Sequence, residues 1–333
     1  MRYLFFLICL GLFACESSAP IQKETPKAQE WAIVLHGGAG TPKFLNQEEE
    51  QAYHAALAEA LQIGKDILAS GGSSADAVEQ TIRYLEDSPL FNAGKGAVIN
   101  AEGVHELDAA FMDGSTMGVG ALTGLTTVKN PISLARKVMS DSKHVFFGGA
   151  GAEQFADEMK VERVDNSYFT TPKRKAAWEK MKAKQDSALA YKPDNIWGHS
   201  RGTVGCVALD KQGRIVAGTS TGGMTMKHSG RIGDAPVIGA GTYANTLVGV
   251  SATGSGEEFI RRQVAYDIAA LMEYGGMNLE EACHQVIGVK MPKDMGGIIA
   301  LDRWGNIQMP FNTPGMFRAA ADASGRFETG IYK

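Results

Sequence analysis

The sequence predicts an α+β fold in which most strands pair antiparallel. Helical and strand patterns occur in blocks, in the order helices, strands, helices, polar stretch, strands, helices, strands, whereas parallel sheets need strict strand–helix alternation. Gln212-Gly213 joins two strand patterns in the way a hairpin turn does. The chain has 333 residues, 44% of them hydrophobic, so it is long enough to bury a full core.

Each element is predicted from its local pattern. Trp31–Leu35 is an apolar run that ends in the glycine-rich turn His36-Gly37-Gly38-Ala39-Gly40. Gln47–Ala69 keeps apolar residues at helical spacing, and Ser73 or Ser74 can cap a second helix that runs to Leu85. The remaining strands are predicted at 107–112, 117–122, 203–209, 214–219, 236–241, 247–251, 296–301 and 306–309, and the remaining helices at 131–140, 152–159, 173–185, 257–274 and 279–289.

The N-terminal segment predicts export. Arg2 precedes the apolar run Tyr3–Ala14, which is too short to span a bilayer but suits the core of a signal peptide. The run ends at Cys15 in a context that resembles a bacterial lipoprotein cleavage site, where the cysteine is acylated; ordinary cleavage after a small residue is the alternative. We expect residues 1–15 to be a signal peptide, 16–30 a tether, and the protein to be periplasmic or membrane-anchored through Cys15.

Charge and cysteine content narrow the classes of partner. The formal net charge of -4 offers no basic excess, so we expect no nucleic-acid partner. Cys206 and Cys283 are the two cysteines outside the export segment, and they can either pair or remain buried thiols. Their spacing predicts neither a disulfide framework nor a zinc site.

A polar stretch, 162–201, interrupts the globular pattern and is interpreted as a flexible surface linker that ends at Gly202. Thr203 then begins a core strand. Amide hydrolysis needs a nucleophile, a base and donors for the oxyanion. The sequence has no plausible Ser-His-Asp set, but a threonine at a new N-terminus supplies both hydroxyl and base, because an α-amino group has a pKa of about 7.7 to 8.0. Cleavage between Gly202 and Thr203 would create that group.

Two further segments, 219–223 and 251–257, place hydroxyls and glycines just after apolar runs. Together with 36–40, Phe91-Asn92-Ala93-Gly94 and 105–109, they resemble the plant-type L-asparaginases, or isoaspartyl peptidases, which are threonine-type N-terminal-nucleophile hydrolases. The resemblance covers nearly all of the chain from Trp31 onward. It implies a four-layer αββα sandwich, cleavage into an α subunit, 31–202, and a β subunit, 203–333, and a homodimer of cleaved protomers.

The resemblance also implies site roles. Thr203 would be the nucleophile, Thr221 would hold its hydroxyl, and Thr253 and Gly254 would form the oxyanion hole. The substrate-binding residues implied are Arg231, Asp234, Thr253, Gly254 and Asn92. An arginine can grip an α-carboxylate and an aspartate an α-ammonium, so this pair predicts a free aspartate head and hydrolysis of the β-amide of asparagine or of β-aspartyl dipeptides.

No cofactor is expected for the chemistry, but a structural sodium ion is. The stretch 85–95 resembles a stabilisation loop whose backbone carbonyls hold sodium. The carbonyls implied are those of Leu85, Glu86, Ser88, Phe91, Ala93 and Lys95. Lys95 stands where an apolar residue was expected.

Other motifs favour structural interpretations. His36 heads a glycine turn and is expected to be a satisfied core histidine. His105, Glu106 and Asp108 alternate along a strand and cannot all face one metal ion. Gly149-Ala150-Gly151 lacks the third glycine of a dinucleotide site and is interpreted as a helix start.

Three other functions compete with the asparaginase hypothesis. A glycosylasparaginase typically has Asp directly before the nucleophile, where this chain has Gly202. The protease relatives known as threonine aspartases carry longer insertions than this chain has. A surface-binding lipoprotein with a decayed hydrolase fold would have lost Thr203, Thr221, Arg231 or Asp234, and all four are present.

Overall fold

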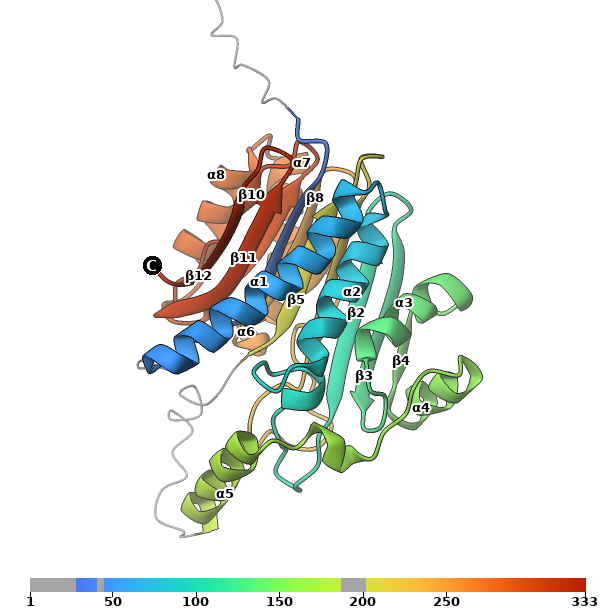
Figure 1. Ribbon diagram of the computed structural model, residues 1–333, viewed down its shortest axis with the longest axis vertical. Coiled ribbons are helices and arrows are strands. Elements are labelled where there is room, and N and C mark those ends of the chain that lie inside the picture. Colours follow the sequence, from blue (N-terminus) through green and yellow to red (C-terminus); the bar gives the residue numbers. More distant parts are fainter. Residues whose placement is uncertain (1–27, 41–44, 187–201) are drawn as a thin grey trace, which may run out of the picture.

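The computed structural model describes residues 28–40, 45–186 and 202–333. The predicted signal peptide, Cys15 and most of the tether lie outside the described residues, as does 187–201. Two sheets stack face to face and carry helices on their outer surfaces (Figure 1). Within the described residues, no helix is both long and apolar enough to cross a bilayer.

The large sheet has eight strands in the order β12-β11-β1-β5-β6-β2-β3-β4. Its neighbours pair antiparallel, except that β3 and β4 are parallel. Its strands are β1 (Ala32–Ala39), β2 (Leu107–Asp113), β3 (Gly118–Leu125), β4 (Phe146–Gly148), β5 (Val204–Leu209), β6 (Ile215–Thr221), β11 (Gly315–Asp322) and β12 (Phe327–Tyr332). The hairpin expected at Gln212-Gly213 joins β5 to β6, with Gly213 at φ 76°.

The small sheet has four antiparallel strands in the order β10-β9-β8-β7. They are β7 (Thr242–Ala244), β8 (Val248–Gly254), β9 (Gly296–Asp302) and β10 (Ile307–Gln308). The α-helices are α1 (Gln47–Ala69), α2 (Ser74–Asp87), α3 (Pro131–Asp141), α4 (Gly149–Glu158), α5 (Pro172–Asp186), α6 (Gly256–Arg262), α7 (Val264–Glu273) and α8 (Leu279–Cys283).

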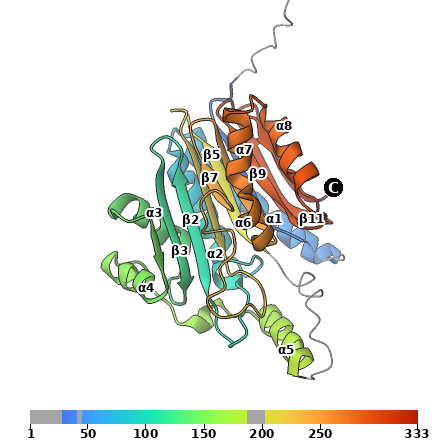
Figure 2. The ribbon, with the colours of Figure 1, turned by 180° about the vertical axis from the view of Figure 1, so that it is seen from behind.

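The four layers are visible from opposite sides. Helices α1, α2 and α3 cover the outer face of the large sheet (Figure 1), and α7 and α8 cover the small sheet (Figure 2). The inner faces of the sheets pack on each other through β1, β5 and β6 on one side and β8 and β9 on the other. The prediction of an α+β, αββα sandwich with largely antiparallel sheets is confirmed.

The layering explains why central strands are apolar along their whole length. On β1, Ile33 and Leu35 enter the core beneath the helices, whereas Ala32 and Val34 enter the core between the sheets. A strand covered on both faces needs no polar alternation, so it appears in the sequence as an unbroken apolar run. The predicted start of α2 is also confirmed, since Ser73 caps the helix by accepting from the Asp76 amide.

Three predicted elements differ from the structure. Residues 236–241 form successive turns, in which the Val237 amide donates to the Asp234 carbonyl, instead of a strand. The helix predicted over 257–274 is broken at Gln263, whose left-handed backbone, φ 48°, divides α6 from α7. The helix predicted over 279–289 becomes a π-helix from His284 to Lys290.

The sequence prediction omitted the short edge strands β4 and β7 and the hairpin of β11 and β12. Strand β11 contains the run Ala319-Ala320-Ala321, which has no β-branched residue and favours helix by local propensity. Pairing with β1 along the sheet overrides that preference. This is a tertiary effect that the local pattern does not reveal.

The first half of the expected linker is folded. Val128 and Arg163 form a β-bridge, Phe169 is fully buried, and α5 follows at Pro172. The prediction that a flexible linker begins at 162 is therefore wrong, because a β-bridge, a buried aromatic ring and a helix anchor this part of the chain. The expected helix at 173–185 corresponds to α5.

The two cysteines in the body of the chain are free, which settles the alternatives left open by the sequence. Cys206 is buried on β5 beneath the helices. Cys283 is buried at the end of α8, in the core around the small sheet. Because they belong to different cores, they are separate structural thiols.

Candidate active site

The Gly202–Thr203 peptide bond lies at the beginning of β5, where the main chain enters the core. The Thr203 side chain is buried, with 7% of the residue exposed. Its hydroxyl donates to the carbonyl oxygen of Gly202 at 2.8 Å and lies 3.2 Å from the Thr221 hydroxyl. The nucleophile expected from the sequence thus lies against the carbonyl group that it would attack, with Thr221 beside it.

The Gly202 carbonyl oxygen accepts two further hydrogen bonds. Asn92 Nδ2 donates at 2.7 Å and Thr221 Oγ1 donates at 3.1 Å. Asn92 is itself held, because the same amide group donates to Gly223 and its oxygen accepts from the Val98 amide. Two preorganised donors on one scissile carbonyl are what stabilise a developing oxyanion.

The glycine turn expected after a short strand is instead the end of β1, which continues to Ala39 with a bulge between His36 and Gly38, and it lies over the predicted cleavage point. A Cβ atom at Gly38, which has φ 116°, would lie 2.9 Å from the Gly202 Cα and 3.3 Å from the Thr203 nitrogen. Glycine is therefore required there by both backbone conformation and space. The next residue, Ala39, donates its amide to Thr253 Oγ1 at 3.1 Å, so Thr253, near the end of β8, is brought to the same region.

His36 is fully buried and has a partner on each ring nitrogen, as expected for a core histidine. Nδ1 lies 2.9 Å from the Thr203 carbonyl oxygen and Nε2 lies 3.0 Å from Ser251 Oγ. Burial lowers the pKa of His36 to about 3, although the bond to Thr203 opposes the shift. The ring is therefore neutral at physiological pH and does not act as an acid.

Arg231 and Asp234 lie on the loop that follows the Thr221 strand. Arg231 forms a two-point ion pair with Glu257, through Nε at 3.1 Å and Nη2 at 2.9 Å. The third guanidinium nitrogen, Nη1, lies toward Gly223 and Gly233, where added Cβ atoms would be 3.5 Å and 3.0 Å away. Glu257 therefore uses one edge of the guanidinium, and the Nη1–Nη2 edge faces the loop beside Thr221.

The Asp234 carboxyl is buried, and within the described residues its Oδ2 makes no hydrogen bond. Burial raises its pKa to about 7, partly offset by the positive charge of Arg231, and nearby Glu257 and Asp108 raise it further. A buried carboxyl with an unused oxygen is suited to a cationic partner, since an ammonium group would satisfy the oxygen and favour its ionisation.

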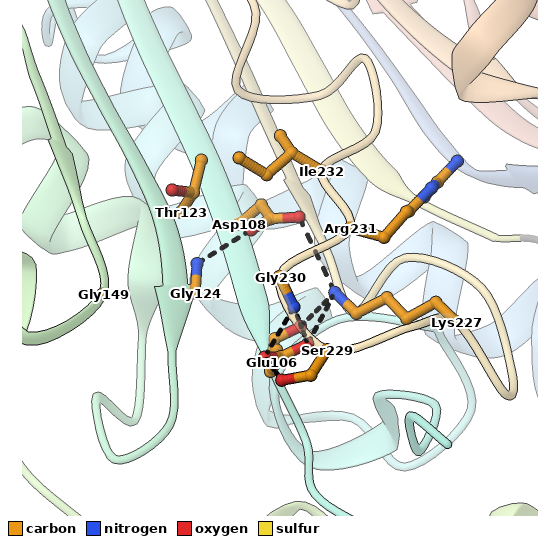
Figure 3. Close-up of a pocket in the computed structure, with 10 residues that line it drawn as sticks. All are labelled: Glu106, Asp108, Thr123, Gly124, Gly149, Lys227, Ser229, Gly230, Arg231 and Ile232. Atoms are coloured by element: carbon orange, nitrogen blue, oxygen red, sulfur yellow. Dashed lines mark hydrogen bonds and ion pairs between the residues drawn. The ribbon is translucent and has the colours of Figure 1, made fainter. Parts of the chain in front are cut away.

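Glu106 and Asp108 surround Lys227, which is buried, and form no metal site. Lys227 Nζ lies 3.8 Å from Glu106 and 4.0 Å from Asp108 (Figure 3). These residues line a cavity of about 270 Å³, and Figure 3 shows the Arg231 side chain pointing away from them. His105 contacts the Val98 carbonyl and Thr170 instead, as expected for a structural residue. No group of three His, Cys, Asp or Glu suited to a metal occurs in the described part of the chain.

Comparison of the sequence with known proteins identifies the family of this chain. A family model described as asparaginase matches residues 29–331. The chain belongs to the asparaginase family. It is 47% identical to an isoaspartyl peptidase of Salmonella typhimurium over 307 residues, which cover 90% of this chain and 98% of that protein. It is 45% identical to an isoaspartyl peptidase of Escherichia coli, covering 90% and 96%. It is 41% identical to a plant-type L-asparaginase of Pyrococcus abyssi, covering 86% and 94%.

Membership of the asparaginase family makes the chain an amide-bond hydrolase with an N-terminal-nucleophile fold. The sequence analysis did not identify Glu257 as the partner of Arg231, nor Lys227 between two carboxylates. The signal for Glu257 was weak, since one acidic residue at a helix start is ordinary. Lys227 could have been suspected from its position among glycines and hydroxyls, but nothing local predicts that a lysine there is buried.

Proposed function

We propose that this asparaginase-family chain cleaves itself between Gly202 and Thr203 and then hydrolyses the β-amide of L-asparagine and of β-aspartyl dipeptides, releasing L-aspartate. One observation carries the proposal. The Gly202 carbonyl contacts the Thr203 hydroxyl and receives donors from Asn92 and Thr221, so nucleophile and oxyanion donors already converge on the bond to be cut.

Self-cleavage is an acyl shift followed by hydrolysis. The Thr203 oxygen attacks the Gly202 carbonyl carbon, and the oxyanion forms where Asn92 and Thr221 donate. The C–N bond then breaks, and the proton lost by the hydroxyl ends on the Thr203 nitrogen. Water hydrolyses the resulting ester, which leaves a carboxylate on Gly202 and a free amine and hydroxyl on Thr203.

Turnover reuses the same hydroxyl. The α-amino group of Thr203 takes the hydroxyl proton, the oxygen attacks the substrate's β-carbonyl, and the amine leaves with that proton. Water then hydrolyses the β-aspartyl ester. Thr253 and Gly254 are proposed to donate to the oxyanion in these steps, and Asn92 to bind substrate once the Gly202 carboxylate has moved away.

Substrate choice is assigned to Arg231 and Asp234. The Nη1–Nη2 edge of Arg231 would bind the α-carboxylate with two parallel hydrogen bonds, and Asp234 Oδ2 would accept from the α-ammonium. A substrate held at both groups presents its β-carbonyl as the reacting end. An α-linked aspartyl peptide lacks the free α-carboxylate and should be rejected.

The proposal is tested by incubating cleaved protein with asparagine and β-Asp-Leu, with α-Asp-Leu and glutamine as controls, and measuring aspartate release. Release from the first two alone is the expected result. Asparagine linked to N-acetylglucosamine is added as a further substrate to test the glycosylasparaginase alternative. A preference for this substrate would establish that alternative. Absence of release from every substrate by cleaved protein would overturn the assignment and favour a binding role.

We also propose that the loop 85–95 binds a structural sodium ion. A Cβ atom at Gly94 would overlap the Glu86 carbonyl oxygen and one at Gly96 would overlap that of Phe91, so two of the implied carbonyls lie against a glycine within the loop and a glycine directly after it. Lys95 places its ammonium 5.5 Å from the centre of the Tyr168 ring, which gives its charge another partner. Thermal unfolding at equal ionic strength in sodium and choline chloride tests this; equal midpoints would exclude a stabilising sodium site.

Assembly and location complete the proposal. We infer that cleaved protomers form a homodimer, for which light scattering should give the mass of two protomers; the mass of one would contradict it.

We infer export from the apolar segment 3–14 and lipid anchoring from Cys15. Cell fractionation should find the protein with membranes and Cys15→Ala in the soluble periplasmic fraction. Identical distribution of both would favour ordinary signal cleavage.

A further inference from the structure

A buried chain of four side chains leads away from the nucleophile and crosses between the sheets. The Thr203 carbonyl contacts His36, whose other nitrogen contacts Ser251. Ser251 Oγ lies 2.7 Å from Thr219 Oγ1, which lies 2.6 Å from Thr242 Oγ1. All four side chains belong to fully buried residues, on β1, β8, β6 and β7 respectively. Their connection reaches from the first residue of the future β subunit to the small sheet.

The hydrogen bonds that link these four side chains run in one direction, from donor to acceptor. A carbonyl oxygen only accepts, so the proton of neutral His36 is on Nδ1 and Nε2 accepts from Ser251. Ser251 then has no second proton, so in their 2.7 Å contact it accepts from Thr219, whose hydroxyl also lies 3.2 Å from the Gly241 carbonyl. Thr242, at the far end, donates to Thr219 or to the Ala235 carbonyl, 2.9 Å away and next to Asp234. The Thr203 carbonyl thus fixes the His36 tautomer, and the donor from Ser251 to Nε2 is compatible with it.

The backbone leaves space for this contact. Gly205 lies opposite His36 in the β1–β5 pairing, and a Cβ atom there would overlap both His36 Nε2 and Ser251 Oγ. Gly205 has no positive φ that would require glycine for conformational reasons. Its missing side chain is explained by the His36–Ser251 pair.

Thr203 needs support that the sheet does not provide. The pairing of β5 with β6 begins at Val204, and its pairing with β1 begins at Gly205. After self-cleavage Thr203 is a chain end; its side chain keeps the contact with the Thr221 hydroxyl, but the bonds from Asn92 and Thr221 to the Gly202 oxygen no longer hold its main chain. The His36 bond acts on the Thr203 carbonyl itself and survives cleavage.

We propose that His36 is the positioning residue of the cleaved nucleophile: its Nδ1–H holds the Thr203 carbonyl, while Ser251, Thr219 and Thr242 hold the ring in the tautomer that can donate. The inference rests on the proposed function. It assigns to the histidine of the glycine turn a role in turnover, exerted through Thr203 and without contact with substrate. Burial, which keeps the pKa of His36 at about 3, prevents a charged ring that would donate from both nitrogens and disrupt the chain.

Two isosteric variants test this role. The amide nitrogen of asparagine occupies the place of a histidine Nδ1, and that of glutamine the place of Nε2. His36→Asn should therefore keep the bond to Thr203 and retain kcat within about threefold, whereas His36→Gln should lose about tenfold to a hundredfold in kcat with KM nearly unchanged. Rates are divided by the fraction of cleaved chain measured by mass spectrometry. An equal decrease in kcat in both variants, or a change in KM alone, would mean that His36 only fills space.

A second readout does not depend on activity. In full-length protein with 15N-labelled histidine, the His36 signal, identified by its absence from His36→Asn, should report the Nδ1–H tautomer, and Ser251→Ala should shift it toward a mixture. An Nε2–H tautomer in the unsubstituted protein, or no response to Ser251→Ala, would overturn the inference. If the unsubstituted protein is correctly folded but inactive, the proposed function fails while the tautomer still decides this inference.

Discussion

Removal of the Asn92 side chain should slow self-cleavage far more than it affects folding. Besides the Thr203 hydroxyl, which becomes the nucleophile, two side-chain donors reach the Gly202 oxygen, Asn92 Nδ2 and Thr221 Oγ1. Loss of one preorganised oxyanion donor costs about 2.7–4 kcal/mol of transition-state stabilisation, which corresponds to roughly a 10²–10³-fold slower step. The rate of self-cleavage in Asn92→Ala should fall by that factor.

The variant also loses buried hydrogen bonds to the Gly223 carbonyl and from the Val98 amide, so its free energy of unfolding should fall by about 2–4 kcal/mol. Asn100→Ala is the matched control. Asn100 is equally buried and accepts from the amides of Glu102 and Val104, but it does not contact Gly202. It should lose similar stability and cleave at the normal rate.

The assay follows the fragment that begins at Thr203 by intact mass over time, below the unfolding temperature of each variant. Asn92→Asp supplies a third test, because its volume is nearly unchanged but it turns an acceptor toward the Gly202 oxygen. It should cleave no faster than Asn92→Ala. Cleavage of Asn92→Ala within about threefold of normal would refute the assignment of Asn92 as an oxyanion donor.

Three further outcomes are expected. Arg231→Lys loses both the Glu257 fork and the paired edge for a carboxylate, so kcat/KM should fall roughly tenfold to a hundredfold, mainly through KM; an unchanged KM would contradict the clamp. Because burial raises the pKa of Asp234 to about 7, kcat/KM should fall as pH drops through 7 more steeply than protonation of the Thr203 α-amino group alone would cause, and in a profile from pH 5.5 to 9 Asp234→Asn should retain only the limb of the amino group. The folded-state pKa of His36 is depressed from 6.5 to about 3, so the unfolded state binds more protons in this window and His36 should lower the free energy of unfolding by up to about 1.4 kcal/mol per pH unit as pH falls below 6.5. Denaturant titrations should show that the free energy of unfolding of His36→Asn falls less steeply as pH decreases.

The sequence was most informative where local patterns and tertiary environment agree. Helix α1 begins and ends where its apolar spacing predicts, and Asn46 and Glu49 form a capping box at its start. Thr203 and Thr221 were paired from their motifs, and the structure brings their hydroxyls to 3.2 Å. These two threonines lie at strand ends, and the ends of apolar runs in the sequence indicate where strands begin and end.

Prediction failed where distant contacts decide the structure. Strand β11 becomes a strand because β1 pairs with it, and Gln263 breaks a helix without any local breaker. The clamp was predicted as an arginine and an aspartate, which lie on a loop, but Glu257, the partner of Arg231, comes from helix α6. Likewise, His36 was correctly expected in the core, yet its link to Thr203 spans 167 residues of sequence.

The central claim, that Thr203 becomes the catalytic N-terminus, is tested most directly by intact-protein mass spectrometry of purified chain after incubation at neutral pH, beside Thr203→Ala. The account predicts two fragments, the second beginning at Thr203, and aspartate release that grows with the cleaved fraction, while Thr203→Ala remains a single inactive chain. A single chain that is fully active, or activity in Thr203→Ala, would contradict it.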